Sequence, residues 1–139
     1  MRGKTFAELQ VGQAAEFSKT VAESDVYLFA GISGDFNPAH INEPYAQQTA
    51  FKSRIAHGML AAGFVSAVIG TRLPGPGTIY MKQELTFLAP VHIGDTITAR
   101  AEVVELIQEK KRVRLRTTCV NQEGVTVLDG EALVSPPRE

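Results

Sequence analysis

Asp35 and His40 are the pair of side chains whose types and spacing best suit acid–base chemistry. They bound the segment Asp-Phe-Asn-Pro-Ala-His, and we expect a loop there because Pro38 keeps it from being a plain helix. Further along, His57-Gly58-Met59 opens an apolar run, which places Gly58 at an expected helix start, where backbone N–H groups have no intrahelical partner. A carboxylate, an imidazole and an oxyanion site together suit proton chemistry next to a carbonyl group.

Three nearby residues allow more than one interpretation. Asn37, a candidate substrate-binding residue, either orients the acid–base pair through its amide or is a turn residue before Pro38. His57, at the helix entrance, is interpreted as structural rather than catalytic. Ser66 lacks the Gly-x-Ser-x-Gly surroundings of a nucleophile, so we expect it to hydrogen-bond along its helix or to a ligand.

A metal centre is not expected. The three histidines, at positions 40, 57 and 92, and the single cysteine offer no tight ligand spacing. Cys119 lies in an alternating stretch and is interpreted as a small strand residue rather than a nucleophile. A lone cysteine is compatible with a reducing, cytoplasmic setting.

Length and composition favour one globular domain over residues 1–139, with a hydrophobic fraction of 44% and a net charge of -1. The near balance of charge argues against nucleic acid and against an anionic membrane surface as partners. The longest apolar stretch, Met59 to Ile69, is shorter than the roughly 20 residues that span a bilayer. We expect a cytoplasmic protein, because no apolar leader follows Met1.

The first half of the chain predicts three helices. Ser24 is the expected N-cap of the first, which ends near Gly31 to Gly34. Asn42-Glu43-Pro44 starts a short second helix that runs to Thr49. The third, from Gly58 to about Arg72, is small and apolar nearly all round, which predicts burial on all sides.

Strand-forming sequence surrounds these helices and predicts an α+β fold. The β-branched, alternating segments are residues 15–20, 79–88, 96–106, 112–120 and 125–134. Short turns between the last four indicate an antiparallel sheet, which must curve to wrap the apolar helix. A five-stranded sheet in a chain this short leaves open edges, so we expect a homodimer.

Several segments together resemble the MaoC-like, (R)-specific enoyl-CoA hydratases, the hydratase 2 family. They are Gly34 to His40, Ala50-Phe51, Ile55 to Leu60, Leu73 to Tyr80 and Leu85 to Asp95. The resemblance covers essentially the whole chain and implies a dimeric hot-dog fold with an overhanging segment. It also implies reversible hydration of trans-2-enoyl-CoA to (R)-3-hydroxyacyl-CoA, with CoA as part of the substrate and no metal or redox cofactor.

The same resemblance implies roles for particular residues. The catalytic carboxylate falls on Asp35, the catalytic imidazole on His40 and the oxyanion-binding amide on Gly58. Ser66 takes the position of a pocket-floor serine, and Ile69 and Val134 take positions that limit acyl length.

The acyl substrate and the reaction type each allow more than one prediction. We expect short to medium chains of about four to eight carbons from the mixed sizes of the pocket residues. Arg54 and the turn Lys110-Lys111-Arg112 are candidates for binding the CoA phosphates, although the turn is most simply solvated.

Three other functions remain competing hypotheses: a hot-dog thioesterase, a dehydratase acting on acyl-carrier protein and a catalytically silent acyl-binding partner. The sequence does not assign which member of the Asp–His pair is the base and which is the acid. The pathway is also left open, with polyhydroxyalkanoate supply and fatty-acid oxidation as two candidates.

Overall fold

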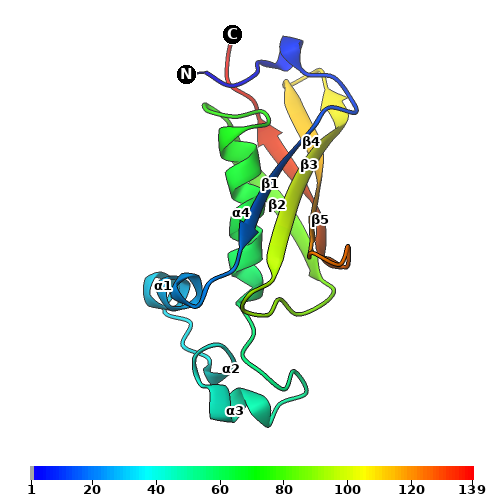
Figure 1. The fold of residues 1–139 in the computed structure, drawn as a ribbon. Helices are drawn as coiled ribbons and strands as arrows, with labels where there is room; N and C mark the ends of the chain where they lie inside the picture. Colours follow the sequence, from blue (N-terminus) through cyan, green and yellow to red (C-terminus); the bar gives the residue numbers. More distant parts are fainter. Residues whose placement is uncertain (1) are drawn as a thin grey trace.

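The computed structural model describes residues 2–139, which form a curved sheet, one long helix against it and a smaller helical segment at one end (Figure 1). The strands are β1 (Ala14–Thr20), β2 (Ile79–Phe87), β3 (Thr96–Ile107), β4 (Arg112–Val120) and β5 (Thr126–Ser135). The helices are the short η1 (Phe6–Glu8), α1 (Glu23–Ser33), α2 (Pro38–Ile41), α3 (Glu43–Gln47) and the long α4 (Gly58–Thr71).

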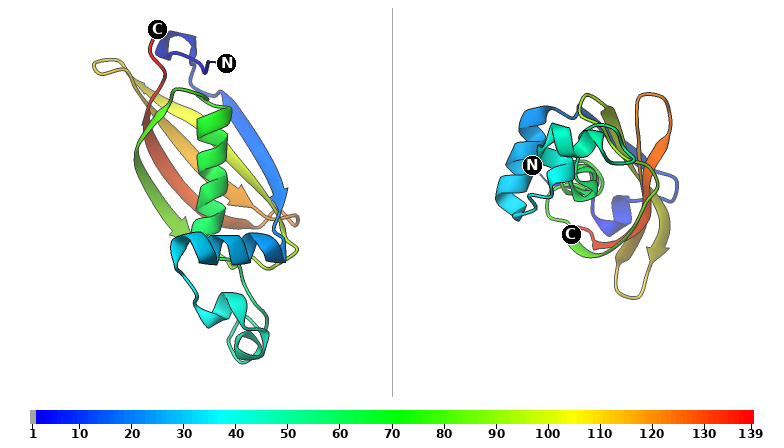
Figure 2. Two further views of the ribbon diagram at one scale, coloured as in Figure 1. Left: turned by 90° about the vertical axis from the view of Figure 1, so that its left-hand side faces the viewer. Right: turned by 90° about the horizontal axis from the view of Figure 1, so that it is seen from below.

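The five strands form one antiparallel sheet, as the sequence predicted, and the structure gives their order as β1-β3-β4-β5-β2. Its inner face comes from alternate small and branched residues, among them Ala99, Ala101 and Leu115, all fully buried. Intervening positions such as Arg100 and Arg116 are more accessible to solvent. The sheet curves around α4 (Figure 2), which is the expected hot-dog arrangement, and leaves β1 and β2 as its edges.

Helix α4 matches its predicted range to within one residue, and its buried side chains form the centre of the core. Val65, Val68 and Ile69 are almost completely buried, and each such side chain stabilises the fold by roughly 1.5–3 kcal/mol. The prediction that α4 is buried on all sides is wrong for the single chain. A sheet covers only one side of a helix, and the other side exposes Met59, Gly63, Ser66 and Gly70.

Cys119 is a buried strand residue, as its sequence context indicated. Its side chain faces α4, with Sγ 3.6 Å from the carbonyl oxygen of Ala61. Burial raises the pKa of the Cys119 thiol to about 12, so the thiolate needed for nucleophilic attack is disfavoured.

Helices α1, α2 and α3 form the overhanging segment beyond the N-terminal end of α4 (Figures 1 and 2). The predicted N-cap of α1 is wrong: the helix begins at Glu23, and the Asp25 carboxylate accepts a hydrogen bond from the Ala22 amide at 2.8 Å. Helix α3 begins beside Pro44 as predicted but ends at Gln47. Within residues 2–139, no helix is long and apolar enough to cross a membrane.

Candidate active site

Asp35 lies directly after α1, where Gly34 ends the helix with a positive φ of 82° that a glycine adopts without strain. Its side chain is exposed, and Oδ1 accepts a hydrogen bond from the Asn37 amide at 3.2 Å. Asn37 in turn accepts one from the Ala39 amide at 3.0 Å and so caps α2. The side chain of Asn37 therefore has the local, turn-forming role, whereas its predicted part in orienting the acid–base pair stays a prediction.

His40 lies in the short helix α2, not in the loop that the sequence predicted. A proline is tolerated in the first turn of a helix because its missing N–H needs no partner there, and Asn37 supplies the cap. The imidazole is 8% exposed, and its Nδ1 lies 2.7 Å from the carbonyl oxygen of Ile55. A carbonyl only accepts, so Nδ1 carries the hydrogen and Nε2 keeps a lone pair that can accept a proton.

His57 packs directly against His40. The two rings stack with centroids 3.9 Å apart and planes 29° apart, and His57 is only 2% exposed. Its Nε2 donates to the main-chain carbonyl of Asp35 at 2.9 Å. The fold thus joins three residues that are separated in the sequence.

Asp35, His40 and His57 each place one potential ligand atom within 4.8 Å of the others, whereas their spacing in the sequence indicated no such group. This proximity corrects the argument from sequence spacing. Stacked rings, however, direct their in-plane lone pairs side by side rather than toward one point, which does not suit a tetrahedral metal centre. The cluster is better suited to acid–base chemistry.

Gly58 is the first residue of α4, and His57 is its N-cap. The amides of this first turn have no intrahelical acceptor, and the helix dipole adds partial positive charge there. A Cβ on Gly58 would lie 2.8 Å from the Phe87 ring, so glycine allows this ring to pack directly against the start of α4. The position therefore has the properties of an oxyanion site.

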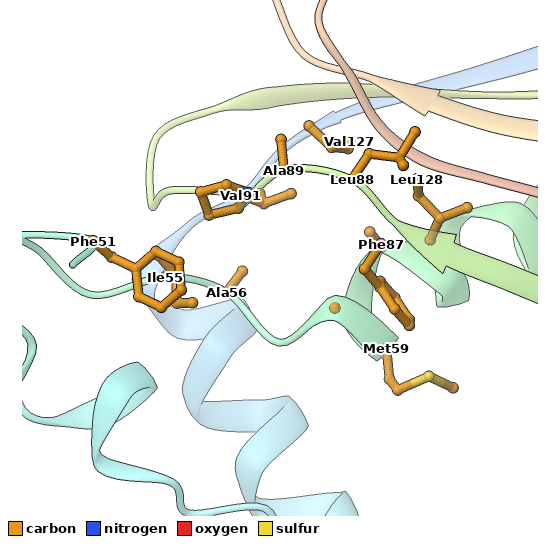
Figure 3. Close-up of a pocket in the computed structure, with 13 residues that line it drawn as sticks. Phe51, Ile55, Ala56, Met59, Phe87, Leu88, Ala89, Val91, Val127 and Leu128 are labelled. Carbon is orange, nitrogen blue, oxygen red and sulfur yellow. The ribbon is translucent and has the colours of Figure 1, made fainter. Parts of the chain in front are cut away.

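An apolar pocket of about 490 Å³ opens beside Gly58 (Figure 3). It lies between the start of α4, the end of β2 and the loop before α4. Its walls include Phe51, Ile55, Met59, Phe87 and Leu128. Its apolar walls suit the hydrocarbon part of a ligand whose polar group reaches the α4 N-terminus.

The three other predicted substrate-binding residues lie away from this cluster. Ser66 lies about 12 Å along the axis of α4 from Gly58, at 1.5 Å per residue, and is exposed in the single chain. Ile69, one turn further on, and Val134, on β5, are buried in the core. Neither Ile69 nor Val134 lines the pocket beside Gly58.

Neither candidate for phosphate binding is placed to support that role within the single chain, and the turn at Lys110 and Lys111 is exposed, as its simplest interpretation indicated. The side chain of Arg54 is only 14% exposed and is already engaged by the Tyr27 hydroxyl and the Glu23 and Glu43 carboxylates. Lys110 and Lys111 lie in the β3–β4 turn, at the end of the molecule opposite α2 and α3 (Figures 1 and 2). Within one chain, neither place presents a free cation to the acid–base cluster.

Comparison with known proteins assigns the chain to a family. The MaoC like domain matches residues 6–125. The chain belongs to this family. The (R)-specific enoyl-CoA hydratase of Rhodospirillum rubrum is 61% identical over 132 residues, which cover 95% of this chain and 91% of that protein. The 3-hydroxybutyryl-CoA dehydratase of Methylorubrum extorquens is 52% identical, covering 96% of this chain and 85% of that protein.

Solved structures of R-hydratases also match this chain over most of its length. The unliganded R-hydratase from Pseudomonas aeruginosa is 50% identical and matches with a TM-score of 0.94, covering 99% of this chain and 88% of that one. The (R)-hydratase from A. caviae matches with a TM-score of 0.91 at 43% identity, covering 93% and 98%. The hot-dog fold and the family resemblance predicted from the sequence are confirmed.

Some residues of this MaoC-like site were missed by sequence reasoning. Phe29 contacts the His57 ring at a centroid distance of 4.8 Å, and Phe87 covers Gly58 from β2. Nothing in the sequence near either phenylalanine signals these contacts, because they depend on how distant elements pack. For His57 a signal existed, since it directly precedes the glycine of the expected oxyanion site.

Proposed function

We propose that this MaoC-like protein is an (R)-specific enoyl-CoA hydratase, which adds water to a trans-2-enoyl-CoA to give the (R)-3-hydroxyacyl-CoA and also catalyses the reverse dehydration. The protein is an enzyme of the hydro-lyase class, as its relatives are. The observation that carries the proposal is the meeting of Asp35 and His40 with His57, the N-cap residue that directly precedes Gly58 at the start of α4. Hydration of a conjugated thioester needs an acid–base pair and an oxyanion site together.

The proposed mechanism uses the hydrogen-bond pattern of the two residues. Asp35 and His40 hold one water, and His40 Nε2 accepts a proton from it because Nδ1 already donates to Ile55. The water oxygen forms a bond to C3 while the C2–C3 π electrons shift toward the thioester oxygen. A proton then returns from the pair to C2, so one water is consumed and both fragments come from one face.

The Gly58 amide is the proposed donor to the thioester oxygen as negative charge develops there. One such donor stabilises a transition state by about 2.7–4 kcal/mol where it has been measured in another enzyme. Positioned acid–base groups contribute about 10²–10⁴-fold in rate. The reaction moves protons and forms one C–O bond without net oxidation. The two side chains and the Gly58 amide therefore supply the acid–base and oxyanion groups of the proposed mechanism, and CoA enters only as part of the substrate.

We propose that the working unit is a homodimer. Edge strand β2 exposes Ile79 and Met81, and the neighbouring exposed side of α4 carries Met59 and Ser66. An unpaired edge beside an apolar surface favours association with a second copy. Met81→Arg should give monomers by sedimentation, whereas Val125→Arg, at an exposed turn, should leave the assembly unchanged. A monomeric wild type would contradict this proposal.

Short to medium acyl chains of about four to eight carbons are the proposed substrates. The relative from M. extorquens bears a four-carbon acyl group in its name, which supports the lower end of this range. Ser66, Ile69 and Val134 are the residues proposed to contact or limit the acyl chain.

The test is loss of the enoyl-thioester absorbance with crotonyl-CoA, coupled to chiral analysis of the product. We expect only the (R)-alcohol. Asp35→Asn and His40→Gln should each lower turnover about 10²–10⁴-fold with the protein still folded. Asp129→Asn, on the outer side of β5 beside Arg116, is the matched control and should retain full activity.

Other outcomes select other functions. Free thiol without hydration would favour a thioesterase, and turnover only of acyl-carrier protein substrates would favour the carrier-dependent dehydratase. Near-normal rates in either the Asp35 or the His40 variant would refute the proposed pair.

A further inference from the structure

We propose that His57 is a positioning residue of the active site: its Nε2–H hydrogen bond to the Asp35 carbonyl fixes the catalytic carboxylate relative to His40. This inference rests on the proposed roles of Asp35 and His40. The role differs from catalysis, because it acts through the main chain of Asp35 rather than through the substrate.

The Asp35 main chain has few other restraints. It follows the end of α1, and its side chain is exposed to solvent. Its amide donates to the Ser33 hydroxyl within the same short stretch, at 3.2 Å. The 2.9 Å bond from His57 is the contact that ties Asp35 to α4, the helix that carries the oxyanion amide. One side chain therefore sets the distance between the carboxylate and the oxyanion site.

His57 also supports His40. The two rings stack at 3.9 Å, and His40 is fixed at its other polar end by the Ile55 carbonyl. Phe29 of α1 contacts the His57 ring at 4.8 Å, so α1, α2 and the start of α4 meet on this imidazole. A displacement of His57 would consequently change the positions of both catalytic groups.

The second ring nitrogen of His57 shows what the imidazole contributes. Nδ1 is buried and has no hydrogen-bond partner among residues 2–139, which costs stability. A phenylalanine ring could fill the same space and stack on His40 without that cost. What the imidazole adds is the Nε2–H donor to Asp35, so the structure favours a role for that bond beyond packing.

Two substitutions at His57 distinguish the effect of its hydrogen bond from the effect of its stacked ring. His57→Gln places an amide N–H near the position of Nε2 but removes the stacked ring, whereas His57→Phe keeps the ring and removes the donor. We expect His57→Phe to lower kcat by about 10²-fold, the effect of a misplacement near 1 Å, with KM nearly unchanged. His57→Gln should restore most of the rate. Should His57→Phe not fold, His57→Asn, whose amide is too short to reach Asp35, takes its place in the comparison.

Val103→Ala, a buried substitution on β3, which carries none of the proposed site residues, controls for general loss of stability and should lower Tm without lowering kcat. Wild-type kcat in His57→Phe, or equal losses in the Gln and Phe variants, would overturn the inference. Asp35→Asn in the same assay keeps the two proposals apart. If Asp35→Asn is inactive while His57→Phe is fully active, only the role of His57 fails; if Asp35→Asn is active, the catalytic pair itself fails.

Discussion

The core around α4 buries its large apolar side chains, whereas the overhanging segment exposes several of them to solvent. In α4, Val68 and Ile69 are 0% and 1% exposed, whereas in and after α1, Leu28, Ile32 and Phe36 are 66%, 82% and 58% exposed. The core is therefore stabilised by burial, in proportion to area removed from water. The segment that carries Asp35 and His40 buries less apolar surface and depends more on a few polar contacts.

Those polar contacts converge on few residues. Arg54, just before α4, joins α1 through Tyr27 and Glu23 and joins α3 through Glu43. His57 joins Asp35 to α4. The comparison implies that core substitutions change mainly the free energy of unfolding, whereas substitutions at these junctions change mainly the geometry of the site.

The largest expected effect on stability is in the core. Ile69→Ala should lower the free energy of unfolding by about 2–5 kcal/mol, because it removes a fully buried side chain and leaves a cavity. It should also shift the chain-length profile toward longer acyl groups, measured with a series of enoyl-CoA substrates. Val104→Ala, on an exposed position of β3, is the control and should change stability by less than about 0.5 kcal/mol. An unchanged profile would remove Ile69 from the pocket assignment.

At the junction between the two regions, Gly58→Ala should lower turnover by about 10²-fold or more, because the added methyl group displaces the Phe87 ring, which lines the pocket beside the oxyanion amide. Tm should stay nearly constant, since the Phe87 ring is half exposed and can turn aside. Gly31→Ala in α1, where an added Cβ meets nothing within 4 Å, should leave turnover unchanged. Full activity in Gly58→Ala would contradict the oxyanion assignment.

Within the overhanging segment, Arg54→Met should lower the free energy of unfolding by about 1.5–3 kcal/mol, since hydrogen bonds to a mostly buried guanidinium are lost. Amide hydrogen exchange should increase in α1 and α3 more than in α4. Arg100→Met removes a more exposed ion pair with Glu102 and should cost less than about 1 kcal/mol. Uniform exchange throughout the chain would indicate that the segment is not separately stabilised.

The smallest effect is expected at the start of α1. The Lys19 ammonium and the Ala22 amide lower the pKa of Asp25, so its stabilising contribution is present above the ordinary carboxyl pKa of about 3.9 and is lost as pH falls through the lowered value. Asp25→Asn should therefore cost about 1 kcal/mol near neutral pH and less in acid. Chemical denaturation of both proteins across this range measures the difference. A pH-independent difference would show that the charge has no part in the cap.

Much of the fold and the chemical core of the site could be read from the residues. Strand boundaries agree to within one residue because alternation and β-branched content are local properties, and α4 is bounded by His57-Gly58 and Arg72 in the same local way. The helical turn α2 was missed, because the capping by Asn37 offsets the usual effect of Pro38. Exposure of one side of α4 was missed as well, because composition records that a helix is apolar but not how much of it a single sheet covers.

The sequence by itself determined the five strands, the long helix α4, the antiparallel sheet, the family and the identity of the candidate acid, base and oxyanion residues, since each depends on residue types and short-range spacing. Only the tertiary structure decided that His57 stacks on His40 and holds Asp35, that Arg54 is occupied by carboxylates and that Phe87 covers Gly58. These contacts join residues from elements far apart in the chain. Their geometry follows from packing, which no local pattern of residues encodes.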